Sequence, residues 1–175
     1  MISNVLTIAG SDSGGGAGIQ ADIKTLSALG VYSATVVTAI TAQNTRGVGG
    51  IHEIPAEIIS EQIDFVLQDI EIHAVKIGML GDDKVIAAVA TALRKYRVKN
   101  IVLDPVMIAK SGARLISSRA VSFLRERLIP GATVLTPNLP EAATLLGIQP
   151  IYTENEMREV ASELLQLGSE WVLLK

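Results

Sequence analysis

The feature of this 175-residue sequence that most constrains its fold is the alternation of short aliphatic, β-branched runs with longer stretches of helical periodicity. The runs that read as strands are residues 5–9, 33–38, 74–77, 101–103, 133–135 and 171–174. Apolar residues recur at helical spacing in residues 18–29, 55–70 and 82–96, and further helices are expected at 119–127, 138–147 and 153–168, the last marked by a capping box of Thr153 and Glu156. Strands separated by helices of this length imply right-handed βαβ units. The sequence therefore predicts an α/β fold with a mainly parallel central sheet and helices on both faces.

One polar segment interrupts this alternation. Residues 43–50 follow the second expected strand and contain three glycines, Gly47, Gly49 and Gly50. We expect a loop here, which forms either a mobile flap or a turn.

Composition excludes several classes of function. The net charge is −3, the isoelectric point is about 5.4 and aromatic residues make up 3%, so no basic or base-stacking surface for nucleic acid is expected. No apolar run approaches the roughly 18 residues of a membrane helix, and the N-terminus lacks a signal-peptide pattern, which leads us to expect a cytoplasmic protein. The absence of cysteine excludes disulfides, cysteine-based zinc sites and a cysteine nucleophile within these residues.

The first strand-to-helix connection, residues 9–18, contains five glycines. It is not a dinucleotide-binding fingerprint, because Ile19 occupies the third glycine position, and it is not a P-loop, because Gly16 stands where lysine is required. Such a loop predicts backbone amides that approach a ligand closely at a helix N-terminus. The alternative is a tight turn with no ligand.

Three polar side chains near this edge of the sheet are candidate ligand contacts. Asp22 lies on the apolar stripe of its helix, so it needs a partner. That partner is either the preceding loop or helix dipole, or a ligand at the sheet edge. Gln43 and Asn44 offer amide donors and acceptors that suit the edge of a heterocycle. We interpret His52 and His73 as structural.

Two later strands share one local form, in which an aliphatic run is followed by one polar residue and then proline. They end in Asp104-Pro105 and Thr136-Pro137, which places both polar residues at the carboxyl edge, where ligands bind parallel sheets. A carboxylate at that edge suits Mg²⁺ together with water and phosphate oxygens.

Two neighbouring features could complete a phosphate and metal site. Glu141 comes three residues after Asn138, so this pair predicts either a capping box or a water-mediated metal contact, and the two roles are compatible. The loop of Lys110, Ser111 and Gly112 could close over a phosphate.

Taken together, these stretches resemble the hydroxymethylpyrimidine/phosphomethylpyrimidine kinases of thiamine biosynthesis. The resemblance covers essentially the whole chain and is carried by residues 9–22, 38–45, 104–107, 110–112 and 136–142, in the order found in that family. It implies a ribokinase-like fold and transfer of the γ-phosphoryl group of ATP, first to the hydroxymethyl oxygen of the pyrimidine and then to the monophosphate. Such transfer depends mainly on positioning and charge neutralisation.

The resemblance also implies roles for ten residues. The aminopyrimidine would contact Asp22 and Gln43, in a pocket shaped by Gly10, Met79 and Val106. Mg²⁺ would be held, directly or through water, by Asp104 and Glu141. The phosphates of ATP would lie near Thr136, Asn138 and Lys175.

Members of the family continue past the strand that ends here at Lys175 into a Gly-Gly-His stretch and, further on, a Gly-Thr-Gly-Cys loop that carries the catalytic cysteine. We therefore expect residues 1–175 to be the N-terminal portion of a longer kinase, with an incomplete sheet and no catalytic residue of their own. The family also implies a homodimer. Two alternatives are a pyridoxine or pyridoxal kinase, and a non-catalytic fragment that binds pyrimidine.

Overall fold

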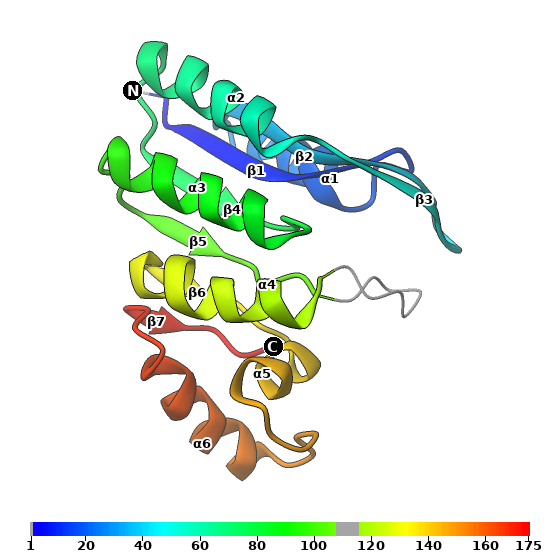
Figure 1. The fold of residues 1–175 in the computed structure, drawn as a ribbon, viewed down its shortest axis with the longest axis vertical. Coiled ribbons are helices and arrows are strands. Elements are labelled where there is room, and N and C mark those ends of the chain that lie inside the picture. Colours follow the sequence, from blue (N-terminus) through cyan, green and yellow to red (C-terminus); the bar gives the residue numbers. More distant parts are fainter. Residues whose placement is uncertain (1, 108–115) are drawn as a thin grey trace.

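The protein forms a seven-stranded sheet in the order β3-β2-β1-β4-β5-β6-β7 (Figure 1). The computed structural model describes residues 2–107 and 116–175, so the expected phosphate loop of Lys110, Ser111 and Gly112 lies outside the described residues. The strands are β1 (Asn4–Asp12), β2 (Tyr32–Asn44), β3 (Gly47–Glu53), β4 (Ala74–Ile77), β5 (Ile101–Leu103), β6 (Val134–Leu135) and β7 (Trp171–Val172). All neighbouring strands pair in parallel except β3, which runs antiparallel to β2. The predicted, mainly parallel sheet is confirmed.

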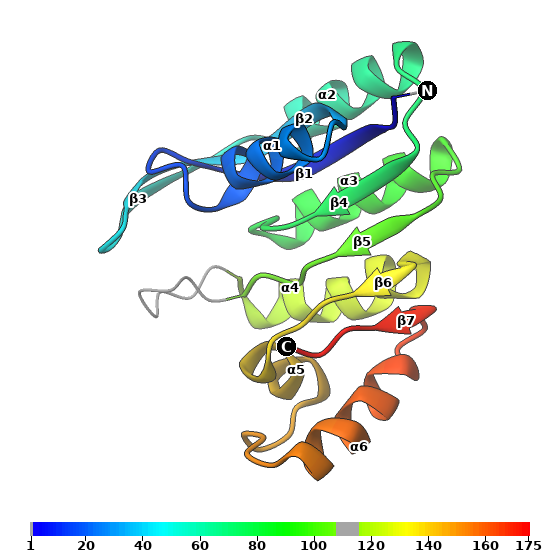
Figure 2. The same ribbon diagram turned by 180° about the vertical axis from the view of Figure 1, so that it is seen from behind.

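Helices cover both faces of this sheet, as the sequence predicted. They are α1 (Gly18–Ala28), α2 (Ala56–Asp69), α3 (Asp83–Lys95), α4 (Ser118–Phe123), α5 (Leu139–Leu146) and α6 (Glu154–Leu165). In Figures 1 and 2, α2, α3 and α4 form a row on one face, α1 lies on the opposite face, and α5 and α6 pack beside β7. No helix in the described ranges is both long and apolar enough to cross a membrane.

The helix expected at residues 119–127 is interrupted in the structure. The α-helical part ends at Phe123 and continues as a π-helical turn, Leu124–Leu128, and a 3₁₀ turn, Ile129–Gly131. Pro130 contributes to this change, because it has no backbone N–H for the hydrogen-bond pattern of an α-helix.

Aliphatic side chains from the strands and from the surrounding helices form the core. The fully buried ones include Leu6, Ile8, Val36, Ile77 and Leu103 on strands, and Ile59, Ile63, Ile86 and Val89 on helices. A parallel sheet is covered on both faces, which explains why its strands read as continuous apolar runs.

The loop expected at residues 43–50 is shorter than predicted, because β2 extends to Asn44 and β3 begins at Gly47 and pairs back onto it. The expected turn is present at residues 45–46. The Asn44 side-chain oxygen accepts hydrogen bonds from the backbone N–H groups of Arg46 (2.8 Å) and Gly47 (3.2 Å) and so fixes the turn. Most of β3 is exposed, so its residues carry no alternation of apolar and polar side chains that would have indicated a strand. The hairpin extends beyond the carboxyl edge of the sheet (Figures 1 and 2).

Helix ends follow the signals in the sequence. Thr153 and Glu156, which stand three residues apart in the sequence, form a capping box at the start of α6. Gly30 follows the end of α1 with a φ of 71°, and Gly147 ends α5 with a φ of 70°. Glycine is favoured at both positions because this backbone region disfavours other residues.

Candidate functional site

A cleft of about 600 Å³ lies at the carboxyl edge of the sheet. It is lined by residues from β1, α1, the β2–β3 hairpin, β4 and the segments that follow β4, β5, β6 and β7. The candidate contact residues from the sequence that line it are Gly10, Asp22, Gln43, Asn44, Met79, Asp104, Val106, Asn138, Glu141 and Lys175. Thr136 does not line the cleft itself, but its hydroxyl bonds to Asp104. The fold thus brings together residues that are far apart in the sequence.

The glycine-rich loop is organised around the carboxylate of Asp12, which is 5% exposed. Its Oδ1 accepts from the N–H of Gly14 (2.8 Å), and its Oδ2 accepts from the N–H groups of Gly16 (2.9 Å) and Ala17 (2.8 Å). The expectation that the amides of this loop face a ligand is therefore wrong for these three groups, because Asp12 already accepts their hydrogen bonds. A buried carboxylate satisfied by several N–H groups fixes the loop conformation.

Glycine is required where this loop enters α1. Gly18 has a φ of 55°, which disfavours L-residues, and a Cβ there would overlap the carbonyl oxygen of Gly10. Gly10 lines the cleft, so the close approach of these two glycines sets the position of one wall.

Asp22 projects from α1 toward the sheet. Its Oδ2 accepts hydrogen bonds from the hydroxyl of Thr7 (2.5 Å) and from Nζ of Lys76 (2.9 Å). The sequence correctly predicted that this carboxylate needs a partner, but its partners lie on β1 and β4, and neither the preceding loop nor the helix end supplies one.

Hydroxyl groups on β2 position the next part of the wall. The hydroxyl of Thr38 donates to the carbonyl oxygen of Met79 (2.6 Å). Oε1 of Gln43 lies 3.2 Å from the hydroxyl of Thr41, which also bonds to the carbonyl oxygen of Ser11 at 2.9 Å. These contacts join β2 to β1 and to the segment after β4.

The polar residues that follow β5, β6 and β7 meet at Asp104. Its Oδ1 accepts from the hydroxyl of Thr136 (3.0 Å) and from Nζ of Lys175 (2.7 Å). The backbone N–H of Lys175 also donates to the carbonyl oxygen of Pro137 (3.0 Å). The Asp104 side chain is 24% exposed, so this cluster stays accessible from the cleft.

Glu141 caps α5 and also lines the cleft. Its side chain accepts from the backbone N–H of Asn138 (2.9 Å), and its own N–H donates to the Asn138 side chain (2.9 Å), so the predicted capping box is present. Burial raises the pKa of the Glu141 carboxyl, against the lowering effect of the Asn138 backbone hydrogen bond. The nearby Asp104 carboxylate raises this pKa further. A cation bound beside Asp104 and Glu141 would favour the charged form of the Glu141 carboxyl.

Within residues 2–107 and 116–175, no three side chains of histidine, cysteine, aspartate or glutamate gather into a metal-binding group. Asp104 and Glu141 both line the cleft and supply two carboxylates. Mg²⁺ commonly binds one or two carboxylates of a protein, while water and phosphate oxygens supply its other ligands. These two carboxylates therefore fit the protein's share of a Mg²⁺ site.

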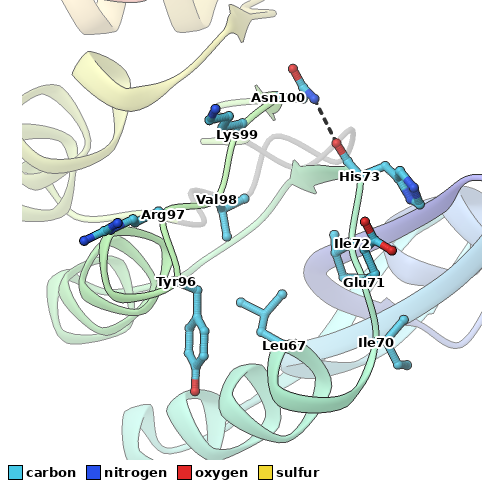
Figure 3. Close-up of a pocket in the computed structure, with 10 residues that line it drawn as sticks. All are labelled: Leu67, Ile70, Glu71, Ile72, His73, Tyr96, Arg97, Val98, Lys99 and Asn100. Atoms are coloured by element: carbon cyan, nitrogen blue, oxygen red, sulfur yellow. Dashed lines mark hydrogen bonds between the residues drawn. The ribbon is translucent and has the colours of Figure 1, made fainter.

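A second cavity, of about 350 Å³, lies at the opposite edge of the sheet, before β4 and β5 (Figure 3). Its polar groups hold backbone segments together: Asn100 donates to the carbonyl oxygen of His73 (2.9 Å), and Nδ1 of His73 accepts from the N–H of Asn4 (3.1 Å). The side chains of Arg97 and Lys99 point away from Tyr96. These contacts support the prediction that His73 is structural.

Sequence reasoning did not identify Asp12, Thr7 or Lys76 as parts of the site. Asp12 could have been found, because an aspartate two residues before a glycine is typical of a turn in which the carboxylate binds backbone amides. Thr7 and Lys76 had no such signal, since only the pairing of β1 with β4 brings them together beside Asp22.

Comparison with known proteins identifies a family. The family model described as phosphomethylpyrimidine kinase matches residues 12–175. The hydroxymethylpyrimidine/phosphomethylpyrimidine kinase of Escherichia coli is 51% identical over 98% of this chain, which covers 65% of that protein. Another curated relative is longer, and the chain spans 35% of its length. The crystal structure of phosphomethylpyrimidine kinase from Clostridium difficile 630 matches with a TM-score of 0.91 at 50% identity, covering 99% of this chain and 74% of that one.

A kinase with another substrate shares the fold. The ADP complex of Bacillus subtilis pyridoxal kinase matches with a TM-score of 0.91 at 38% identity, covering 99% of this chain and 66% of that one. The backbone alone therefore does not separate the two kinases, whereas sequence identity favours the pyrimidine kinases.

Proposed function

Since this chain belongs to the phosphomethylpyrimidine kinase family, we propose that it is part of an enzyme that phosphorylates 4-amino-5-hydroxymethyl-2-methylpyrimidine and then its monophosphate, in thiamine diphosphate biosynthesis. The acceptor oxygen forms a bond to the γ-phosphorus of ATP, the bond from that phosphorus to ADP breaks, and the hydroxymethyl group loses its proton in the first step. The proposal is supported by one cleft whose lining includes side chains suited to a heterocycle and side chains suited to phosphate and a metal ion.

The heterocycle would bind at the β1, α1 and β4 end of the cleft. Asp22 supplies a carboxylate acceptor and Gln43 an amide, while Gly10, Met79 and Val106 supply surfaces against which a small ring can pack. A carboxylate and an amide can together bind the amino group and a ring nitrogen of an aminopyrimidine.

The nucleotide would bind at the β5, β6 and β7 end. Lys175, whose side chain is 49% exposed, supplies a cation for phosphate oxygens when it moves from Asp104. Thr136 binds the same oxygen of Asp104 as Lys175, and Asn138 is the N-cap of α5, whose N-terminus favours anions. Asp104 and Glu141 would hold Mg²⁺, which would neutralise charge on the phosphate oxygens when bound.

The test is calorimetric titration of this chain with hydroxymethylpyrimidine, pyridoxine and ATP, the nucleotide with and without Mg²⁺, followed by phosphorus NMR of mixtures of ATP and acceptor. We expect tighter binding of hydroxymethylpyrimidine than of pyridoxine. Asp22→Asn should weaken pyrimidine binding about tenfold, which corresponds to the loss of one charged hydrogen bond, and should leave ATP binding unchanged. Glu141→Gln should weaken only the Mg²⁺-dependent part of ATP binding, since glutamine keeps the capping box.

Asp69→Asn is the control, because Asp69 is exposed at the end of α2 and makes no side-chain hydrogen bond or ion pair with the residues in the described ranges. Preference for pyridoxine would favour a pyridoxal kinase. Pyrimidine binding without phosphoryl transfer would favour a non-catalytic binding fragment. If Asp22→Asn and Glu141→Gln changed the affinity for neither hydroxymethylpyrimidine nor ATP, the assignment of the cleft would be wrong.

We also propose a cytoplasmic homodimer, as the family resemblance implies. Ile40 and Ile51 on the β2–β3 hairpin are 52% and 43% exposed, which is apolar surface that a second copy could cover. Sedimentation equilibrium of the chain and of an Ile51→Lys variant tests this. A monomeric wild-type chain would contradict the dimer, and cell fractionation tests the location.

A further inference from the structure

The pairing of β1 with β4 places an ammonium group and a hydroxyl group side by side beneath α1. Thr7 and Lys76 are directly opposite each other in the parallel register, so their side chains project from the same face of the sheet. Thr7 is fully buried, and the Lys76 side chain is 28% exposed. Both groups donate to the carboxylate of Asp22, which belongs to α1.

Both donors bind the same oxygen of the carboxylate. Oδ2 of Asp22 accepts from the Thr7 hydroxyl at 2.5 Å and from the Lys76 ammonium at 2.9 Å. Across the part of the chain that the structure describes, no protein donor forms a hydrogen bond to Oδ1. The Asp22 side chain is 18% exposed and lines the cleft, so Oδ1 remains as the acceptor available to a ligand.

The cleft also leaves room for the lysine. Gly78 follows β4, and a Cβ there would lie 3.0 Å from Nζ of Lys76 and 3.2 Å from the Cβ of Ala9. A side chain at residue 78 would therefore crowd β1 and push the Lys76 ammonium by a few tenths of an ångström. The absence of a side chain at Gly78 preserves the ion pair at the wall of the cleft.

From this geometry we propose that Lys76 is a positioning residue of the pyrimidine site, which holds Asp22 by Oδ2 and thereby presents Oδ1 to a hydrogen-bond donor on the ligand. An ionised carboxylate accepts hydrogen bonds and donates none. The site would therefore select a heterocycle that carries an amino group over one that carries a carbonyl oxygen in its place. This inference rests on the proposed function, since it assigns the aminopyrimidine to this end of the cleft.

The selectivity follows from the cost of an unmade hydrogen bond. An amino group satisfies Oδ1, whereas a carbonyl oxygen would bring a second acceptor against a carboxylate that has lost its water. Without Lys76, the carboxylate keeps only the Thr7 hydroxyl and can rotate, so the preference for an amino group should fall.

The experiment compares Lys76→Met, which keeps the length of the side chain and removes its charge, with Lys76→Arg, which keeps the charge. Calorimetry measures the dissociation constants of hydroxymethylpyrimidine, of its counterpart with an oxygen in place of the amino group, and of ATP with Mg²⁺. We expect Lys76→Met to weaken binding of the amino compound about tenfold and to reduce the amino-over-oxo preference by a similar factor. Binding of ATP should stay within about twofold, which also reports that the variant is folded. Lys76→Arg should restore most of the preference.

Lys95→Met is the matched control, because Nζ of Lys95 also lies 2.9 Å from an aspartate, Oδ1 of Asp64, but does so on the surface and outside the cleft. It should change none of the three constants. If Lys76→Met weakened both pyrimidines equally, or left the amino-over-oxo ratio unchanged, Lys76 would not position Asp22. If the wild-type chain bound no hydroxymethylpyrimidine, the proposed function and this inference would both fall.

Discussion

Replacing Asp12 by asparagine would test whether this carboxylate holds the glycine-rich loop. Both carboxylate oxygens are used, Oδ1 by Gly14 and Oδ2 by Gly16 and Ala17. Asparagine has the same shape but only one acceptor oxygen, so its NH₂ group must face at least one of these N–H donors.

The expected loss of stability follows from those contacts. A hydrogen bond to a charged group contributes about 1.5–3 kcal/mol, and a neutral one about 1 kcal/mol. Asp12→Asn loses one charged hydrogen bond outright and converts the other two to neutral bonds, so the low end of these ranges gives a cost of about 3 kcal/mol. In a protein of this size, that cost lowers Tm by about 6–12 °C.

Urea unfolding followed by circular dichroism measures this cost, and amide hydrogen exchange localises it. The N–H groups of Gly14, Gly16 and Ala17 should exchange faster in Asp12→Asn. Amides of the central strands should show only the decrease in the free energy of global unfolding. Asp69→Asn makes the same chemical change at an exposed position and should stay within about 0.5 kcal/mol of wild type. An Asp12→Asn protein as stable as this control, with its loop amides still protected, would refute the reasoning.

Two further substitutions test other local features. Gly18→Ala should cost at least about 2 kcal/mol in urea unfolding, because it combines a positive φ with overlap of a backbone oxygen, whereas Gly147→Ala, with a similar φ and open space around it, should cost only about 1 kcal/mol. Equal losses would show that the overlap is relieved without cost. The pKa of the Glu156 carboxyl is lowered, chiefly by the hydrogen bond from the backbone N–H of Tyr152. The charged carboxylate should therefore stabilise the fold at pH values above its ordinary pKa, and this stabilisation should be lost as the pH falls through the lowered pKa. Glu156→Gln should therefore be less stable than wild type at pH 7 but equal to it in acid. If the difference in unfolding free energy between the two proteins stayed constant across this pH range, the role of the Glu156 charge would be wrong.

Much of the fold could be predicted because its signals are local. The strand at residues 101–103 and the helix that starts at Thr153 are marked by a β-branched run and a capping box, which involve only nearby residues. The β2–β3 hairpin could not be predicted in this way, because most of β3 is exposed and buries no regular apolar face.

The same distinction between local signals and long-range contacts applies to the candidate site. Asp104 and Thr136 could be placed at the sheet edge, since each follows an aliphatic run and precedes proline. The partner of Asp22 could not be identified, because Lys76 is distant in the sequence and becomes its neighbour only when β1 pairs with β4.

The sequence by itself determined the succession of strands and helices, the helix caps and the polar residues that end each strand, since these depend on periodicity and on hydrogen bonds within a few residues. Only the tertiary structure decided which polar groups meet. Strand order and register set the distances between side chains from different elements, and the pairing of β1 with β4 placed Thr7 and Lys76 where both bind Oδ2 of Asp22.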